Sequence, residues 1–218
     1  MWIASFDPGL KNLAFSIEEL PDDFMKKLKI PAKNNRLDIY GEVTKDYKTF
    51  LKDFFKISKT ILFKKVDLNT KSENPKVLDR SVFLELTKVL DEHKDYWNKC
   101  SYVVIEQQMS FGKNINVTAL KISQHVYSYF IFYHGIYKEV FFFPAYNKTQ
   151  LLGAPKKLSK PERKKWSVAI STEIWIERDD KDSLKTLSTY KKKDDVCDCL
   201  IMNLAFIIYH LIDNKKLN

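Results

Sequence analysis

Two acidic residues end runs that are otherwise largely apolar. Asp7 follows residues 2–6 and leads into a Pro-Gly turn, and Glu106 follows residues 102–105. An ionised carboxylate at the end of a buried strand costs free energy unless a cation or hydrogen-bond donors meet it. Asp7 could cap the turn, and Glu106 could be an exposed strand end. Because ligands of open α/β sheets bind beyond the carboxyl ends of strands, both positions also favour a binding site.

A second group of acids stands at the start of an apolar segment near residue 200. In the sequence KKKDDVCDCL, Asp195 and Asp198 are three residues apart, so they project from one face of a helix. Asp194 lies four residues before Asp198 and shares that face approximately. Helix capping would explain Asp194 and Asp195. It does not explain Asp198, which lies a full turn inside the apolar segment and therefore requires a cation.

Asp7, Glu106, Asp195 and Asp198, hereafter the four acids, together predict a metal site. Four converging carboxylates would repel one another unless divalent ions neutralised them. Oxygen ligands favour Mg²⁺, with Mn²⁺ able to substitute, over zinc. Two such ions about 4 Å apart would activate a water molecule and stabilise the leaving oxygen of a phosphodiester. In a basic protein, this chemistry predicts a nuclease with two Mg²⁺ ions in its active site.

The composition is typical of a basic globular protein. The 218 residues include 37 Lys and Arg against 28 Asp and Glu, a formal net charge of +9, and 44% of them are hydrophobic. The excess of positive charge favours a polyanionic partner such as nucleic acid, although a lysine-rich proteome would also produce it. Cys100, Cys197 and Cys199 form neither an even disulfide framework nor a metal-ligand spacing. They indicate buried thiols in a reducing compartment.

Hydrophobic periodicity predicts a β-hairpin followed by alternating helices and strands. Strands are expected at residues 2–6, 13–17, 36–44, 101–108 and 138–145. Helices are expected at residues 81–97, 117–134 and 194–212, with a further one that follows residues 154–166 and ends near residue 177. Residues 45–80 indicate a lysine-rich insertion with short helices. This order predicts an α/β fold with a mixed sheet, in a single domain spanning residues 1–218.

Three motifs resemble those of a known enzyme family. FDPGLKN, VVIEQQMSFGKN and KKKDDVCDCL are similar, in order and spacing, to the acidic motifs of the RNase H-like Holliday junction resolvases. The poxvirus and fungal mitochondrial group resembles the chain most, and bacterial RuvC is a more distant relative. The resemblance covers residues 1–17 and 101–212, while residues 18–100 partly form an insertion after the N-terminal hairpin. It implies a five-stranded mixed sheet flanked by helices.

The resemblance also implies an activity. Carried over to matching positions, the four acids would be catalytic metal ligands of a Mg²⁺-dependent endodeoxyribonuclease, with Asp194 left open. A homodimer, joined through the helix at residues 117–134, would resolve a four-way DNA junction by paired symmetric nicks. An RNase H-like nuclease acting on other branched DNA or on an RNA–DNA hybrid is one alternative. A non-catalytic DNA-binding protein on the same fold is another.

A basic segment and a polar loop supply candidate DNA contacts. Six basic residues between positions 154 and 166 are predicted to line the DNA path: Lys156, Lys157, Lys160, Arg163, Lys164 and Lys165. The resemblance places a functional lysine in this segment and leaves Lys156 and Lys164 open. Gln107, Phe111 and Lys113 follow the strand of Glu106 and are further predicted contacts. Phe111 could stack at the junction centre or anchor its loop.

No run in the sequence is judged long and apolar enough to cross a membrane, so no membrane partner is expected. The first predicted strand begins at residue 2 without a basic leader, which predicts neither a signal peptide nor a mitochondrial presequence. Many Lys and Asn codons and only 5 Gly are typical of an AT-rich genome. Together with the resemblance, these features favour a cytoplasmic location, such as a viral replication site.

Overall fold

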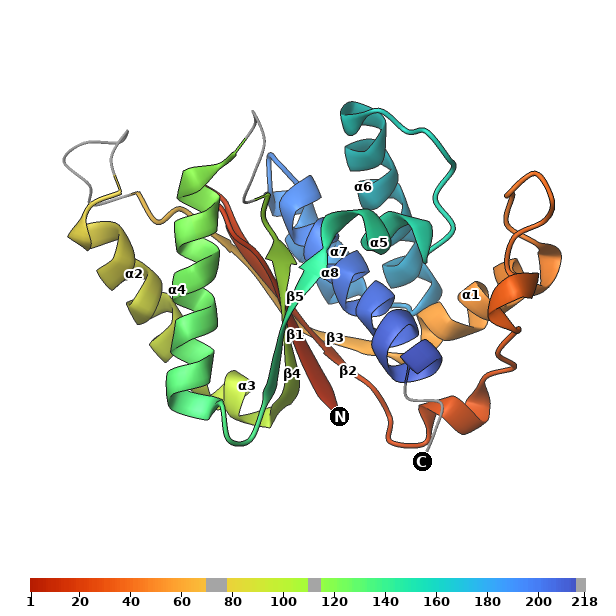
Figure 1. Cartoon of the computed structure of the whole chain (residues 1–218), viewed down its shortest axis with the longest axis horizontal. Helices are drawn as coiled ribbons and strands as arrows, with labels where there is room; N and C mark the ends of the chain where they lie inside the picture. The colour runs from red at the N-terminus through yellow and green to blue at the C-terminus, as the bar shows by residue number, and fades with distance from the viewer. Residues whose placement is uncertain (70–77, 110–114, 215–218) are drawn as a thin grey trace.

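A five-stranded mixed sheet forms the centre of the computed structural model, which describes residues 1–69, 78–109 and 115–214 (Figure 1). The strand order is β3-β2-β1-β4-β5. The strands are β1 (Trp2–Asp7), β2 (Leu13–Glu19), β3 (Lys59–Val66), β4 (Cys100–Gln107) and β5 (Glu139–Pro144). β2 pairs antiparallel with β1 and β3, whereas β4 pairs parallel with β1 and β5. The mixed sheet expected from the sequence is confirmed.

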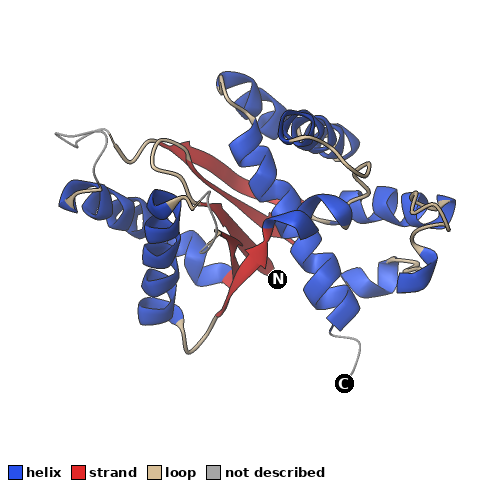
Figure 2. Cartoon of the chain, turned by 45° about the horizontal axis from the view of Figure 1, so that its top comes forward, coloured by secondary structure: helices blue, strands red, loops and turns tan. Residues whose placement is uncertain are grey.

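Helices cover both faces of the sheet, as Figures 1 and 2 show. α2 and α4 pack on one face, α8 packs on the other, and α5 and α6 pack against α8. The helices are α1 (Lys45–Ile57), α2 (Arg80–Glu92), α3 (Lys94–Lys99), α4 (Val117–His134), α5 (Ala145–Gln150), α6 (Lys160–Glu177), α7 (Lys181–Thr189) and α8 (Asp194–Phe206). Short 3-10 turns (Phe24–Lys27, Lys33–Asn35) and a π-helical segment (Ile207–Asn214) complete the described chain.

Alternation along the central strands decides which side chains face α8. On β1, Ile3 packs in the hydrophobic cluster beneath α8, whereas Phe6 packs in the cluster beneath α2 and α4. Successive side chains of a strand point to opposite faces, so Asp7 continues the row that faces α8. The same alternation on β4 assigns Glu106 to that face. The sheet therefore presents both carboxylates to the helix that carries Asp198.

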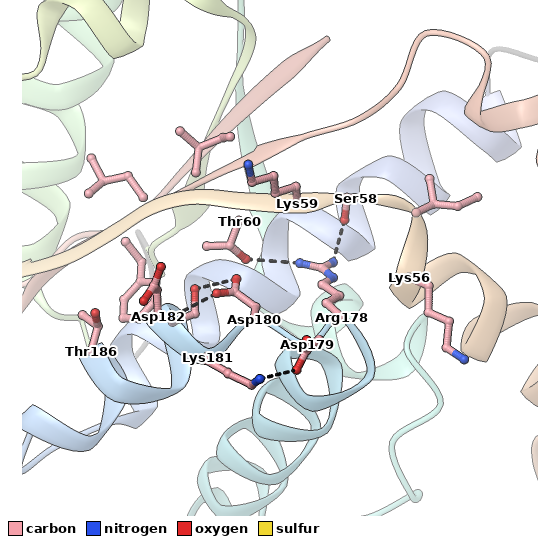
Figure 3. Close-up of a pocket in the computed structure, with 15 residues that line it drawn as sticks. Lys56, Ser58, Lys59, Thr60, Arg178, Asp179, Asp180, Lys181, Asp182 and Thr186 are labelled. Carbon is pink, nitrogen blue, oxygen red and sulfur yellow. Dashed lines mark hydrogen bonds and ion pairs between the residues drawn. The ribbon is translucent and has the colours of Figure 1, made fainter.

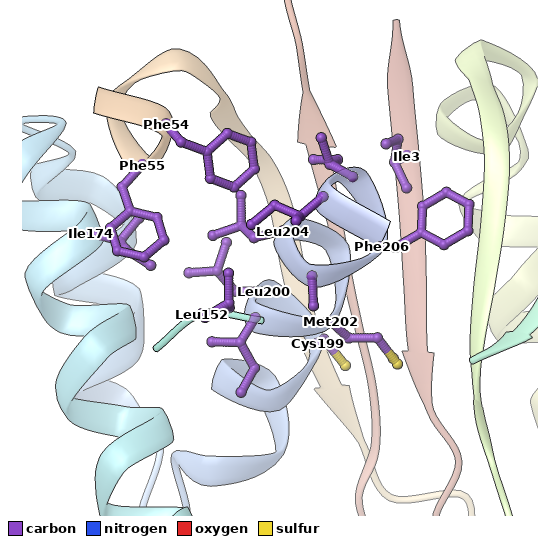
Figure 4. Close-up of a cluster of buried hydrophobic side chains, with 14 of the residues drawn as sticks. Ile3, Phe54, Phe55, Leu152, Ile174, Cys199, Leu200, Met202, Leu204 and Phe206 are labelled. Atoms are coloured by element: carbon purple, nitrogen blue, oxygen red, sulfur yellow. The ribbon is translucent and has the colours of Figure 1, made fainter. Parts of the chain in front are cut away.

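The hydrophobic cluster beneath α8 fixes the position of this helix. Figure 4 shows Leu200 and Leu204 of α8 beside Phe54 of α1 and Ile174 of α6. All four side chains are fully buried. Because burying one such side chain stabilises a fold by about 1.5–3 kcal/mol, this contact holds α8 firmly against the sheet. The acidic start of α8 is consequently placed over the carboxyl ends of β1 and β4.

α8 and the π-helical segment form one apolar stretch, Asp194–Asn214, which is long and apolar enough to cross a bilayer by length and composition alone. By length and composition, the expectation that no run could cross a membrane is therefore wrong. In the structure, 83% of its most apolar window is buried inside the molecule. It is therefore the core helix of this fold.

The third strand lies elsewhere than the sequence pattern predicted. Residues 36–44 form a turn with one isolated bridge between Leu37 and Val43, not a strand. The Asp38 carboxylate accepts hydrogen bonds from the backbone N–H groups of Tyr40 and Glu42, which closes the turn. The third strand is β3, in the segment predicted to hold only short helices. The lysines of β3 interrupt the apolar alternation by which a strand is predicted, because a strand at the edge of a sheet can carry charged side chains toward solvent.

A buried ion pair fastens the outer strands to α6. The Arg178 guanidinium donates to Oε2 of Glu18 at 2.9 Å and to Oγ of Ser58 at 2.6 Å. Thr60 on β3 donates to Oε1 of Glu18 at 2.6 Å. Figure 3 shows Arg178 between Ser58 and Thr60, beside a cavity between β3 and the α6–α7 turn. Every oxygen of Glu18 is hydrogen-bonded, so the buried charge is compensated.

Candidate active site

Asp7 and Glu106 end neighbouring parallel strands, and their carboxyl groups lie within hydrogen-bonding reach of each other. The register places Phe6 beside Ile105, so the next residues of both strands are neighbours as well. Burial raises the pKa of Asp7 well above its usual range, and the charge of Glu106 raises it further. Carboxyl groups held so close favour a shared proton or a cation between them.

Lys148 is the cation that contacts Glu106, and it joins this carboxylate to Asp198. Its ammonium group donates to Oε1 of Glu106 at 2.8 Å and to Oδ2 of Asp198 at 2.9 Å. Only 8% of the Lys148 side chain is exposed. Burial by itself would lower the pKa of Lys148, but the charges of Asp198 and Glu106 raise it well above the usual range. Burial opposes ionisation of Glu106, yet Lys148 outweighs it and lowers the pKa of that carboxyl.

Asp198 reaches the cluster from α8 and is held there by α6. Its Oδ1 accepts a hydrogen bond from Oγ of Ser167 at 2.6 Å, while its Oδ2 faces Lys148. One residue further along α8, the backbone oxygen of Cys199 accepts a 2.7 Å hydrogen bond from Oγ of Ser5 on β1. These contacts fix the height of α8 over the sheet. The structure thus brings Asp7, Glu106 and Asp198 together around one lysine.

Asp194 and Asp195 are held by other lysines. Lys164 of α6 pairs with Asp194, and hydrogen bonding to Lys164 together with the charge of Lys192 outweighs burial and lowers the pKa of Asp194. Lys192 donates to Oδ1 of Asp195 at 2.5 Å, while burial and the charge of Asp194 raise the pKa of Asp195. Oδ2 of Asp195 is buried without a hydrogen-bond partner among the described residues.

The donor set fits a divalent cation that prefers oxygen. Among the described residues, no three Asp, Glu, His or Cys side chains are already arranged as a metal cage. Two features nevertheless favour a cation. Lys148 brings positive charge between Glu106 and Asp198, and the second oxygen of Asp195 is buried and unpartnered. Carboxylate oxygens are the ligands that Mg²⁺ prefers.

Most of the predicted DNA contacts are exposed to solvent. Lys156, Lys157, Lys160, Arg163 and Lys165 are exposed, as is Gln107 at the end of β4. Lys164 is half-buried because it pairs with Asp194. Phe111 and Lys113 lie outside the described residues. Exposed positive charge at these positions is compatible with phosphate binding.

Two residues of the cluster were absent from the predicted set. The resemblance placed a functional lysine between residues 154 and 166, and the lysine that contacts Glu106 and Asp198 is Lys148, outside that segment. Its signal was its place shortly after β5, the strand that pairs with β4. Because α5 starts directly after Pro144, it turns Lys148 back over the sheet edge. Ser167 carried no signal in the sequence, since a serine inside a helix is common.

Comparisons with known proteins agree with this architecture. No family model matches the chain. It is 33% identical to uncharacterized protein 170L of Invertebrate iridescent virus 6, over 98% of this chain and 91% of that protein. It is 30% identical to uncharacterized protein 97L of Invertebrate iridescent virus 3, over 94% of this chain and 98% of that protein.

Three solved structures share the fold. The Fowlpox virus resolvase in complex with Holliday junction DNA matches with a TM-score of 0.55 and 18% identity, over 96% of this chain and 98% of that one. RuvC of Thermus thermophilus matches with a TM-score of 0.56 and 13% identity, over 97% of this chain and 96% of that one. The yeast mitochondrial Holliday junction resolvase Ydc2 matches with a TM-score of 0.50 and 11% identity, over 94% of this chain and 78% of that one. The predicted RNase H-like fold, and the resemblance to this group, are thereby confirmed.

Proposed function

The chain belongs to the family of the iridescent-virus proteins 170L and 97L, and from this and its fold we propose that it is a nuclease that resolves four-way DNA junctions. One observation carries the proposal: Asp7, Glu106 and Asp198 meet around Lys148 at the carboxyl ends of β1 and β4. Acids gathered from three separated segments are costly to keep together, and a nuclease active site gives them a use.

We propose Mg²⁺ as the cofactor, two ions per site, with Mn²⁺ as a substitute. Asp7, Glu106, Asp195 and Asp198 would hold the ions. When bound, such ions supply a nucleophilic water and stabilise the charge of the leaving oxygen. Ser167 orients the Asp198 carboxylate, and Lys148 offsets the mutual repulsion of the acids before substrate arrives. The ammonium of Lys148 would also stabilise negative charge that develops on a phosphate bound beside Asp198.

DNA is the proposed partner because the start of α6 and the connection before it carry exposed basic side chains. The exposed residues Lys156, Lys157, Lys160, Arg163 and Lys165, with Lys164 and Gln107, would bind the backbone phosphates that flank the cut. Phe111 and Lys113 remain proposed contacts. The Fowlpox virus resolvase shares the fold and binds Holliday junction DNA, which supports branched DNA as the substrate. Both family members are viral proteins, and we propose a cytoplasmic viral replication site as the place of action.

A homodimer is proposed because the last turn of α4 and the residues that follow it expose large apolar side chains. Phe132 is 81% exposed, Ile136 90% and Tyr137 82%. Exposed apolar side chains gathered in one patch are typical of an interaction site. Two copies joined through this patch would hold two active sites in a fixed relation, as paired symmetric nicks require.

The proposal is tested with a synthetic four-way junction, end-labelled on each arm in turn and incubated with Mg²⁺. Wild type is compared with Asp7→Asn and Asp198→Asn, with linear duplex and an RNA–DNA hybrid as control substrates. Paired nicks that yield ligatable duplexes, lost in both variants while junction binding persists, are expected. Cleavage of the hybrid alone would assign the protein to RNA removal. Tight junction binding by wild type without cleavage in Mg²⁺ or Mn²⁺ would leave a DNA-binding protein.

A further inference from the structure

A groove of about 600 Å³ lies beside the candidate active site, on the far side of α5. One wall is the turn of residues 37–43, within the segment that departs from the resolvase pattern. The other walls are α5, the connection of residues 153–158 and the first turn of α6. The acids do not line it. The groove is therefore separate from the site described above, although α5 contributes to both.

The lining of the groove combines positive charge, an aromatic ring and apolar surface. Lys48, Lys156, Lys157 and Arg163 line it, and Glu42 is the one acid among its lining residues. Such a charge balance favours an anion. Lys156, Lys157 and Arg163 are exposed and belong to the predicted DNA path. Phosphate is the anion that a basic groove next to a nuclease site would meet.

Tyr146 is the aromatic side chain of the groove and is 63% exposed. Leu37 and Val43 line the same groove from the turn of residues 37–43. An exposed ring and aliphatic side chains in one groove, with cations nearby, match the way that proteins hold unpaired bases. Stacking supplies the affinity for the base, and positive charge holds the backbone.

The wall that faces Tyr146 is firmly built. Arg36, at the base of the turn, pairs with both oxygens of Asp213 at 3.0 and 2.6 Å, and its guanidinium lies 5.2 Å from the centre of the Tyr47 ring. Nζ of Lys156 donates to the backbone oxygen of Tyr40 at 3.3 Å, which joins the two sides of the groove. A rigid wall lowers the entropy cost of binding.

Two helices connect this groove to the acids. On α5, Lys148 contacts Glu106 and Asp198, whereas Tyr146 and Thr149 line the groove. On α6, Arg163 lies one helical turn before Ser167, the residue that holds Asp198. One turn of helix rises about 5.4 Å, which is close to the spacing of neighbouring phosphates along a strand. A strand cut at the acids would thus reach the groove within a few nucleotides.

We propose that this groove binds one unpaired nucleotide of branched DNA, with its base against Tyr146 and its phosphate on Lys157 and Arg163. The inference rests on the proposed nuclease function and deepens it. A branch point offers unstacked bases at little cost, whereas a base in intact duplex must first be extruded. The groove is therefore expected to favour branched over linear DNA. The turn of residues 37–43 forms one of its walls.

The test measures binding of two fluorescein-labelled probes by anisotropy, in EDTA so that no cleavage is needed. One probe is a dT decamer, and the other is a decamer of abasic deoxyribose units with the same charge. Wild type is expected to bind the dT decamer about ten-fold more tightly. Tyr146→Ala should remove this preference, and Tyr146→Phe should keep it. Arg163→Gln should weaken both probes and reduce the salt dependence of binding.

Tyr96→Ala and Lys185→Gln are the matched controls, since both residues lie outside the groove. Both controls should bind the two probes as wild type does. Equal binding of the two probes by wild type, or a base preference that survives in Tyr146→Ala, would overturn the inference. The junction assay tests the nuclease activity separately. If the protein prefers the dT decamer through Tyr146 but never cuts junctions, the proposed nuclease function is refuted and the proposed nucleotide binding in the groove stands.

Discussion

Nζ of Lys148 lies 2.9 Å from Oδ2 of Asp198, and this ion pair joins α5 to α8 across the top of the sheet. The same nitrogen contacts Glu106 at 2.8 Å. The positive charge of Lys148 therefore reduces the repulsion between Glu106 and Asp198. The arrangement makes the stability of the protein, and not only its activity, depend on which cation lies between them.

Lys148→Met should lower the melting temperature in EDTA and increase the stabilisation that Mg²⁺ provides. Without metal, the variant leaves three acids without their cation, so its melting temperature should fall below that of wild type. Mg²⁺ should raise the melting temperature of the variant more than that of wild type, because ligand binding stabilises the folded state. Junction cleavage should drop about 100-fold or more. Lys185→Met is the control, and an equal Mg²⁺ shift in both proteins would contradict this account.

Ser167→Ala should slow cleavage through the position of Asp198. The variant removes the 2.6 Å hydrogen bond to Oδ1 but leaves the Lys148 contact in place. Groups that orient metal ligands typically contribute about 10- to 100-fold to activity, so kcat should fall in this range while KM is retained. Ser171→Ala is a matched control, since this equally buried serine hydrogen-bonds to Cys197, with its backbone oxygen at 3.4 Å, and not to an acid. Equal rates in the two variants would assign Ser167 to packing alone.

Arg178→Met should destabilise the fold without touching the acids. It leaves the buried Glu18 carboxylate without its cation, which costs about 3–5 kcal/mol of unfolding free energy. Urea denaturation measures this loss. Replacing Glu18 and Arg178 together by Met should cost less than Arg178→Met alone, since no buried charge then remains. Lys181→Met, at a position whose side chain is 82% exposed, should change little.

The two histidines of α4, His125 and His134, should make the fold less stable as the pH is lowered from about 7.5 to 5. Burial lowers the pKa of His125 and of His134, and Lys138 lowers that of His134 further. Near and below the usual histidine pKa of about 6.5, the unfolded chain then binds more protons than the folded one. The free energy of unfolding therefore decreases as the pH falls through this value. Urea midpoints at several pH values measure the slope. His125→Gln should flatten it, and a slope unchanged in that variant would exclude His125 as a source.

Phe132→Glu should separate the proposed dimer. A charge in the exposed apolar patch of α4 cannot be buried against a second copy without a large desolvation cost. Sedimentation should show a monomer, and the junction should be nicked in one strand at a time. Ile176→Glu introduces the same charge on an exposed apolar position of α6 and should leave the mass unchanged. A wild type that sediments as a monomer at assay concentration would end the dimer proposal.

The chain order and alternation of residues were enough to predict much of this protein. Apolar runs that end in Asp7 and Glu106 specify two strands and the face on which each acid lies, because the side-chain period of a strand is local. The spacing of Asp195 and Asp198 likewise follows from the geometry of one helix. Such patterns predicted the mixed sheet, which is confirmed. They also predicted that Asp7, Glu106, Asp195 and Asp198 converge, and of these four the structure brings Asp7, Glu106 and Asp198 together near Lys148, whereas Asp195 pairs with Lys192.

Tertiary packing alone decided which cation meets the acids. The place of Lys148 shortly after a predicted strand did not reveal which acids it contacts, because these contacts depend on the turn after β5 and on α8 lying over the sheet. Packing also directed Asp194 and Asp195 toward Lys164 and Lys192. The strand β3 was missed for the same reason: long-range pairing with β2, not local pattern, makes a lysine-rich segment extended. Sequence specifies faces and spacings, and only the folded chain brings distant charges together.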